Sequence, residues 1–421
     1  MRAKFPRTII TAAAAGLAVA AGPLAAQAAS ASVSGTVFVP CNPTTLATDL
    51  AGAFSGEIMM LASNCTYVLT SALPDITTDL TLRGFATTLE RSLTGSPPDF
   101  SLLDVTSAVD VNISGLNFVN GAAADEGGAI DNDDDGALTV SGGTFSGNTS
   151  GEYGGAIYND GFLSLTGATF IGNTAPGEYG GAIYNEYDAA ISRSGFTGNS
   201  AYEGGAVYSD YNTVLANSTF SGNNASEYGG GLYIEDSGIT NVSATSFTGN
   251  TAEYGGGAYN YGYGATFVNT QFNSNRAGSE GGGIYNDYNL TLTGGSLSGN
   301  SAPYGGGVYD DSDLVTTGAT VFTSNTADEG GGLYVDEYAT VTGAYFQRNT
   351  ASDAGGGIFM DGDHLTLQNS TVTTNGAPSG DGGGVYNDEG PGGVSLIGTN
   401  MITRNYGGNC APTSSVDGCT G

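Results

Sequence analysis

Residues 145–158 read Phe-Ser-Gly-Asn-Thr-Ser-Gly-Glu-Tyr-Gly-Gly-Ala-Ile-Tyr, and this stretch decides the fold. It contains two signatures, Phe-x-x-Asn and Gly-Gly-small-aliphatic-aromatic, which alternate along the chain. The Asn of the first signature recurs eleven times at intervals of 24 to 30 residues, and the Gly-Gly signature also recurs eleven times, from Gly127 to Gly384. A period in this range is typical of a solenoid, in which each repeat packs only on its neighbours.

The segments between the signatures indicate strands rather than helices. Runs such as Leu163–Thr166 and Leu290–Thr293 alternate apolar and polar residues, which is the period of a half-buried strand. Gly, Thr, Ser and Asn dominate the repeats and are poor helix formers. The sequence therefore predicts an all-β fold, a right-handed parallel β-helix of about eleven coils of about 25 residues with an N-terminal cap. We expect three short strands in each coil, with coils stacked about 4.8 Å apart.

Three columns of residues are predicted to hold the coils together. The fourth position of the Gly-Gly signature is aliphatic in every repeat, as at Ile157, and we expect it to face the interior. The Phe column faces inward as well, with Leu297 and Val372 replacing Phe in two repeats. The Asn column closes a turn and is predicted to stack as a ladder of amides.

The first 28 residues are predicted to be a signal peptide. Arg2, Lys4 and Arg7 precede an apolar run from Ile9 to Leu24, and Ala26-Gln27-Ala28 is a small-x-small cleavage pattern. A membrane anchor is the alternative, which is disfavoured because the run is short and no stop-transfer flank follows. We therefore expect a secreted, extracellular protein without membrane insertion.

Charge restricts the partners. The chain has nine cations and 41 acids, a net charge of −32, and three of the cations lie in the predicted leader. A phosphate backbone and an anionic membrane surface would both be repelled, so nucleic acid is excluded as a partner. Cations or a positively charged surface are the electrostatic partners that remain.

Four cysteines form two local pairs near the ends of the chain. In an exported protein an even number of cysteines indicates disulfides, and we predict Cys41–Cys65 and Cys410–Cys419. Free thiols or a zinc site are the alternatives, and a zinc site is poorly supported because there is no Cys-x-x-Cys and the one histidine is His364.

The predicted division of the chain follows from these features. After the signal peptide, residues 29–110 form the N-terminal cap and first coils, residues 111–405 the β-helix repeats, and residues 406–421 a tail closed by a disulfide. In the cap, Asn42 and Pro43 predict the start of a helix whose Leu46 and Leu50 share one face.

The residue after the inward aliphatic position should point outward and is aromatic in most repeats. We predict a ladder of rings, and the favoured interpretation is that the rings stack on each other and stiffen the sheet. The alternative is that the ladder binds an extracellular glycan or a cell-surface protein, and this face is the candidate contact. The tyrosines of this candidate binding face are Tyr158, Tyr184, Tyr208, Tyr233, Tyr259, Tyr285, Tyr309, Tyr334 and Tyr386.

An acid precedes almost every Gly-Gly pair. Rows of carboxylates suit Ca²⁺, which takes several oxygen ligands, although the chain has neither an EF-hand loop nor the calcium-binding Gly-Gly-x-Gly-x-Asp repeat. The favoured interpretation is a solvated acidic face that needs no cofactor. The candidate calcium ligands are Glu152, Glu178, Glu203, Glu227 and Glu253.

No catalytic residue is assigned. A polysaccharide lyase needs a base, and the only candidates beyond the leader are His364 and arginines on mostly distant coils. A glycoside hydrolase needs only two carboxylates, but the acids are spread along the rod rather than concentrated at one irregular point. The pattern therefore favours a protein without catalysis.

The alternating signatures resemble the repeats of the polymorphic outer membrane protein family over residues 115–405. The resemblance implies a surface-exposed β-helix linked to adhesion. The chain departs from that family in lacking a C-terminal β-barrel translocator, so we expect no autotransporter route. We predict an adhesin-like or carbohydrate-binding protein; the alternatives are a polysaccharide hydrolase with paired carboxylates and a purely structural extracellular rod.

Overall fold

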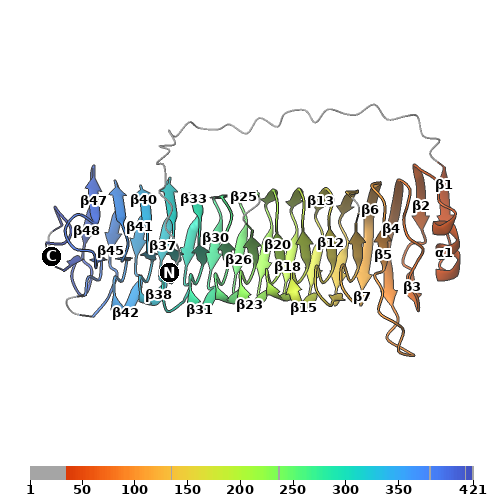
Figure 1. Ribbon diagram of the computed structural model, residues 1–421, viewed down its shortest axis with the longest axis horizontal. Coiled ribbons are helices and arrows are strands. Elements are labelled where there is room, and N and C mark those ends of the chain that lie inside the picture. Colours follow the sequence, from red (N-terminus) through yellow and green to blue (C-terminus); the bar gives the residue numbers. More distant parts are fainter. Residues whose placement is uncertain (1–34, 134, 236–237, 379–380, 413, 420–421) are drawn as a thin grey trace, which may run out of the picture. The chain divides into compact units, whose positions relative to one another are not determined.

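The computed structural model describes residues 35–133, 135–235, 238–378, 381–412 and 414–419, so the predicted signal peptide lies outside the described residues. From Ser34 onward the chain forms one compact unit. Its strands are stacked along a single axis, from β1 (Thr36–Val39) at one end to β49 (Cys410–Ala411) at the other (Figure 1). The prediction of an all-β parallel solenoid is confirmed.

One coil shows how the repeat folds. It runs through β12 (Ile157–Asn159), β13 (Leu163–Thr166), β14 (Thr169–Ile171) and β15 (Thr174–Tyr179). β12 belongs to a 13-stranded sheet, β13 and β14 to a 27-stranded sheet, and β15 to a 7-stranded sheet. A coil thus has four strands rather than the expected three. Gly167, with φ of 69°, turns the chain between β13 and β14 without removing either from its sheet.

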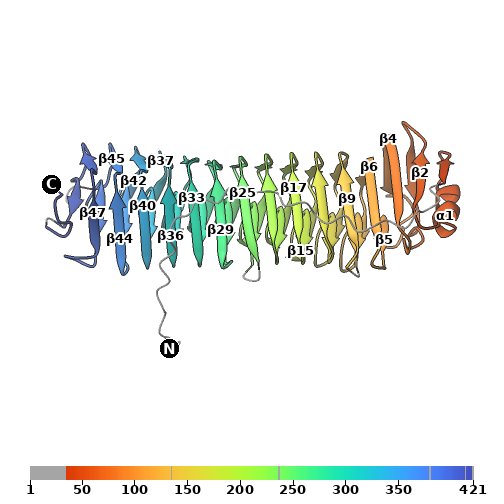
Figure 2. The same ribbon diagram turned by 90° about the horizontal axis from the view of Figure 1, so that it is seen from above.

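Every coil stacks on the next in parallel register. β12 pairs with β16 (Ile183–Asn185), which places Ile157 opposite Ile183 and Tyr158 opposite Tyr184. Figure 2 shows the strands of successive coils side by side across the axis. The stack has about 15 turns rather than eleven, because N-terminal strands such as β4 (Leu80–Arg91) and β6 (Asp110–Val119) continue it without carrying the signatures.

The predicted interior columns are confirmed. The Phe side chains are buried and stack face to face along the axis, with ring centroids 4.6 Å apart for Phe145 and Phe170 and 4.3 Å apart for Phe322 and Phe346. The aliphatic column, for example Ile157, is fully buried beside them. The spacing of parallel strands is close to the stacking distance of aromatic rings, so a repeat of identical residues packs without gaps.

The Asn column forms the predicted amide ladder. The Nδ2 of Asn250 donates to Oδ1 of Asn275 at 2.9 Å and to the carbonyl of Phe220 at 3.1 Å. Its Oδ1 accepts from both the backbone N–H and the Nδ2 of Asn223, each at 2.9 Å. Each buried amide is therefore satisfied by the coils before and after it, which removes the cost of burying a polar group.

The helix predicted in the N-terminal cap is present. Helix α1 (Pro43–Ala51) begins after Asn42, whose side chain accepts from the backbone N–H groups of Thr44 and Thr45 at 2.9 and 3.1 Å. Its buried residues are Leu46 and Leu50, which pack into the core. Both predicted disulfides, Cys41–Cys65 and Cys410–Cys419, are confirmed. Within the described ranges, no helix has the length and apolar character needed to cross a membrane.

Truncation of one interior ring tests the role of the Phe column. We expect Phe247→Ala to lower the free energy of unfolding by about 3–5 kcal/mol, because it empties a buried site between two stacked rings. Chemical denaturation measures the change, with Ser221→Ala on the exposed face of the preceding coil as the control. Equal stability of the two variants would contradict the assignment.

Candidate functional site

The outer face of the 13-stranded sheet carries one outward side chain per coil, and from Tyr158 to Tyr386 this side chain is aromatic. The strands hold it between two inward residues, as Tyr208 stands between Val207 and Ser209. Neighbouring rings are nearly parallel, with centroids 4.7 Å apart for Tyr208 and Tyr233 and 5.3 Å apart for Tyr233 and Tyr259. These rings form a cluster outside the main core.

The rings are less accessible than the sequence suggests. Tyr158, Tyr208, Tyr233, Tyr259, Tyr285 and Tyr334 are buried, at 5–9 % exposure, whereas Tyr184, Tyr309 and Tyr386 are half-buried. Stacking covers their flat faces, and tyrosines that precede the Gly-Gly pairs, such as Tyr228 and Tyr254, pack against them. The rings therefore present little of their flat faces to solvent, because the spacing of the coils is close to the stacking distance of aromatic rings. Use of this row for binding stays a prediction.

The hydroxyl groups of the row point to carboxylates on the following coil. Tyr158 donates to Glu186 at 2.7 Å, Tyr334 to Asp361 at 2.7 Å and Tyr259 to Asp287 at 3.1 Å. We call these acceptors the hydroxyl-side acids. They are Glu186, Glu235, Asp287, Asp311, Asp336 and Asp361.

A second row of acids flanks the rings. These residues, which precede the Gly-Gly pairs and include Glu203 and Glu280, are called the glycine-side acids here. The pKa of Tyr208 is raised by burial, by its hydrogen bond to Glu235 and by the charges of Glu235 and Glu203. Acids of both rows therefore act on a single ring. We call the stacked tyrosines with both rows of acids the tyrosine strip.

Crowding changes the protonation of the strip. Burial, followed by the charges of Glu235 and Glu178, raises the pKa of Glu203 to about 7. Burial and the neighbouring carboxyl groups of Asp336 and Asp287 raise the pKa of Asp311. Carboxyl groups this close together hold protons near neutral pH, or else attract cations that replace those protons.

The row changes character at its N-terminal end. The strand register places Asp131 opposite Tyr158, and Asp104 opposite Asp131, so two coils carry Asp where the later coils carry an aromatic ring. Together with Phe100, Ser101 and Glu126, among others, these two residues line a hollow of about 290 Å³. The coils that contain Asp104 and Asp131 therefore interrupt the regular repeat. This interruption is hard to recognise in the sequence because acids occur all along the chain. Its signal is Ile-Asp-Asn at residues 130–132, where residues 157–159 are Ile-Tyr-Asn.

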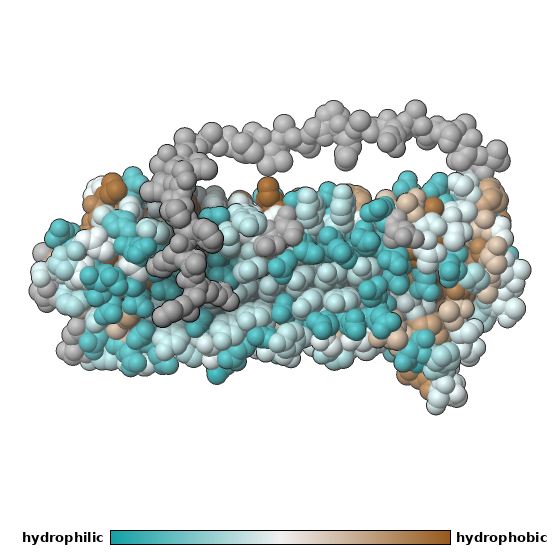
Figure 3. All heavy atoms as spheres, in the orientation of Figure 1, coloured by the Kyte–Doolittle hydropathy of each residue, from teal (hydrophilic) through white to brown (hydrophobic). Residues whose placement is uncertain are grey.

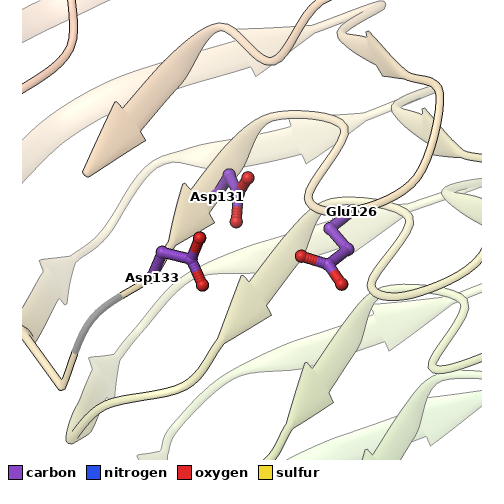
Figure 4. A group of neighbouring side chains, drawn as sticks. All are labelled: Glu126, Asp131 and Asp133. Carbon is purple, nitrogen blue, oxygen red and sulfur yellow. The ribbon is translucent and has the colours of Figure 1, made fainter. Parts of the chain in front are cut away.

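Three carboxylates converge beside this hollow. One oxygen each of Glu126, Asp131 and Asp133 lies within 4.8 Å of the others (Figure 4). Burial, followed by the charges of Asp133, Asp104 and Glu126, raises the pKa of Asp131 to about 7. Burial likewise raises the pKa of Asp104 to about 6.

These residues fit a hard cation. Oδ1 of Asp131 and Oδ1 of Asp104 are buried without a hydrogen-bond partner, and carboxylate oxygens are the ligands that Ca²⁺ prefers. In the part of the chain that the structure describes, Glu126, Asp131 and Asp133 are the group that could share one ion. The five glutamates of the sequence prediction are not in this group, and calcium binding by them stays a prediction.

Comparison with known proteins agrees with the fold. A family profile of the right handed beta helix region matches residues 230–405, and the Chlamydia polymorphic membrane protein repeat matches residues 142–160, 167–186 and 217–235. The chain is therefore similar to right-handed β-helix proteins, and three of its repeats are similar to the polymorphic membrane protein repeat. This fold and these repeats fit a surface or adhesin-like protein, and the two disulfides indicate an extracellular environment.

One solved structure is similar to the chain at a low level. It is the PL6 family alginate lyase AlyGC, with a TM-score of 0.43 and 13% sequence identity over 91% of this chain and 53% of that enzyme. The chain thus spans about half the length of the lyase. No curated protein matches the chain.

Calcium binding can be tested at the converging carboxylates. If they hold Ca²⁺, the melting temperature should be higher in calcium than in chelator, by the equivalent of about 2.7 kcal/mol when calcium is a hundredfold above its dissociation constant. Asp131→Asn should remove this shift, and Glu227→Gln should retain it. Loss of the shift only in Glu227→Gln would move the site to the row that contains Glu203, Glu227 and Glu253, and no shift in the wild type would remove calcium from both places.

The raised carboxyl pKa values predict a dependence of stability on pH. The folded state holds protons on Asp104, Asp131 and Glu203 that the unfolded chain releases at lower pH, so their contribution is complete below the unfolded pKa values and is lost as pH rises through about 6–7. The melting temperature should therefore fall by a few degrees between about pH 5 and about pH 8 at constant ionic strength. Replacing the three residues by Asn, Asn and Gln should flatten this dependence; a melting temperature that rises over the range would contradict it.

Proposed function

We propose that this is a secreted, non-catalytic, adhesin-like protein that binds an extracellular glycan or a cell-surface protein through the tyrosine strip. The observation that carries the proposal is the repetition of one unit, a tyrosine hydroxyl bonded to a carboxylate of the next coil. Identical units in line can each engage one unit of an extended ligand. Many weak contacts then add up to firm attachment, which suits adhesion better than turnover.

The distribution of polar residues supports binding at a surface. The side of the rod visible in Figure 3 is hydrophilic along most of its length, and hydrophobic residues gather there mainly near the N-terminal coils. A long hydrophilic side favours polar and charged ligands over an apolar partner. Secretion is supported by the predicted leader and by the two disulfides, which persist in oxidising compartments.

A polysaccharide hydrolase is the second candidate, and it rests on the N-terminal hollow. Asp104 and Asp131 have raised pKa values there, as a general acid requires, and other carboxylates lie nearby. Arg91 lies over the ring of Phe100, which lines the same hollow, with 5.9 Å from its guanidinium carbon to the ring centroid. This arrangement would suit a single site at the end of the strip.

A purely structural rod is the third candidate. The stacked rings stiffen the sheet without any ligand, as the close contact between Tyr208 and Tyr233 illustrates. The acidic rows would then serve to keep rods apart in solution.

One experiment separates the three candidates. The exported protein is incubated with insoluble polysaccharides and with whole cells, and both retained protein and new chain ends are followed with time. We expect retention without new chain ends, and loss of retention in the triple variant Glu186→Gln, Glu235→Gln and Asp287→Asn. New chain ends that disappear in folded Asp131→Asn would favour the hydrolase, and neither retention nor chain ends would leave the structural rod.

A further inference from the structure

We infer that the ligand of the tyrosine strip is a linear, amine-bearing polysaccharide that lies along the axis of the rod with roughly one sugar ring per coil. This inference rests on the proposed function and narrows it to one ligand class. It follows from three features of the strip: its negative charge, the spacing of its rings along the axis and the presence of two rows of acids.

Charge points to a cationic ligand on this side of the rod. The 27-stranded sheet is nearly free of acids, since its strands from β9 (Ala137–Ser141) to β48 (Met401–Thr403) contain a single one, Asp313. The strip, in contrast, carries two rows of acids, and charges from both rows act on its rings. A cationic polymer would therefore settle on the strip, whereas uronate polymers would be repelled from it.

Spacing distinguishes a polysaccharide from a basic peptide. Successive rings of the strip lie about one coil apart, with centroid separations from 4.7 Å for Tyr208 and Tyr233 to 5.6 Å for Tyr158 and Tyr184. In an extended peptide, side chains on one side are separated by about 6.6–6.8 Å, so lysines would fall out of step with the carboxylates after a few coils. A hexose in an extended β-1,4-linked chain advances by a length close to the strand spacing of about 4.8 Å.

The two rows of acids match the symmetry of such a chain. Successive rings of a β-1,4-linked polymer are turned over relative to each other, so their amino groups project alternately to the two sides. The hydroxyl-side acids would take one set of ammonium groups and the glycine-side acids the other. Glu203 and Glu235 illustrate one such pair, with one acid from each row acting on Tyr208.

The stacked rings provide the floor between the rows. Each tyrosine hydroxyl is already bonded to one oxygen of a hydroxyl-side acid, as Tyr158 is to Glu186. The hydrogen bond fixes the carboxylate in place and leaves it further acceptor sites for an ammonium group. Tyr187 and Tyr211 add exposed rings on the turns beside the strip, at 48% and 38% exposure, with apolar faces that suit the C–H face of a sugar.

The test compares three soluble probes by calorimetry at mildly acidic pH and low ionic strength. The probes are β-1,4-linked glucosamine oligomers, their N-acetylated counterparts of equal length, and oligolysine of equal charge. We expect the glucosamine oligomers to bind at least about tenfold more tightly than either of the others. Affinity should rise with oligomer length and fall with added salt.

Matched variants locate the binding. Glu186→Gln, Glu235→Gln and Asp287→Asn remove three charges but keep an oxygen that can accept the tyrosine hydroxyl. The control removes three charges from the 27-stranded sheet by Glu90→Gln, Asp110→Asn and Asp313→Asn. We expect about a tenfold loss of affinity in the first variant and little change in the control, with far-ultraviolet circular dichroism showing that both fold.

The possible failures are distinguishable. Acetylated oligomers that bind as tightly and lose affinity in the strip variant would overturn the amine-bearing ligand but leave adhesion through the strip standing. If oligolysine binds as tightly as the glucosamine oligomers, the coil spacing does not select a polysaccharide over a peptide. No binding of the glucosamine oligomers would overturn the inference altogether, while retention on cells or other polysaccharides would still support the proposed function. If the strip variant does not fold, the comparison of probes and the length dependence in the wild type decide the matter.

Discussion

The amide ladder is the constraint on which the rest of the structure depends. Each buried Asn donates its Nδ2 to the Oδ1 of the next, at 2.9–3.0 Å from Asn148 through Asn349. A coil that slipped by one residue would leave these amides unpaired in the interior and would turn the Phe column outward. The ladder thereby fixes the register, and insertions of one or two residues are accommodated in turns elsewhere in the coil.

A fixed register has a consequence on the outside of the rod. The same alignment that stacks the Phe rings within the core stacks the tyrosines on the outer face and brings like-charged carboxylates close together. Repulsion between these acids opposes folding. Hydrogen bonds from tyrosine hydroxyls and retention of protons offset part of this repulsion, and a cationic ligand would offset more. The repulsion within the acidic rows and their capacity to bind cations thus have the same origin, which is the close spacing of carboxylates that the register imposes.

Much of this architecture follows from the sequence. The period and the residue types suffice to predict the inward columns and the Asn ladder, because each depends on a repeated position. The helix that begins after Asn42 and the pairing of the four cysteines can also be predicted, because they depend on local chemistry. The number of turns does not follow, since the N-terminal coils keep the strand pairing without the signatures. Outward orientation of the tyrosines is predictable, but their burial is not, because it arises from contacts between coils and with residues such as Tyr228. The cluster around Asp131 is hard to recognise for the same reason: Glu126 and Asp133 come together only once the turns are built.

Removal of one complete coil tests the central claim, that register places an equivalent binding unit on every coil. Deleting residues 276–300 joins Asn275 to Ser301, which occupies the register position of Arg276, and removes Tyr285 together with Glu280 and Asp287. The account predicts that the shortened protein still folds cooperatively. Its affinity for a glucosamine oligomer longer than the strip should be lower than that of the wild type. The decrease should be about as large as the increase in affinity that one added sugar ring gives to a short oligomer. Unchanged affinity would contradict equivalent units along the strip, and a protein that fails to fold would contradict the independence of the coils.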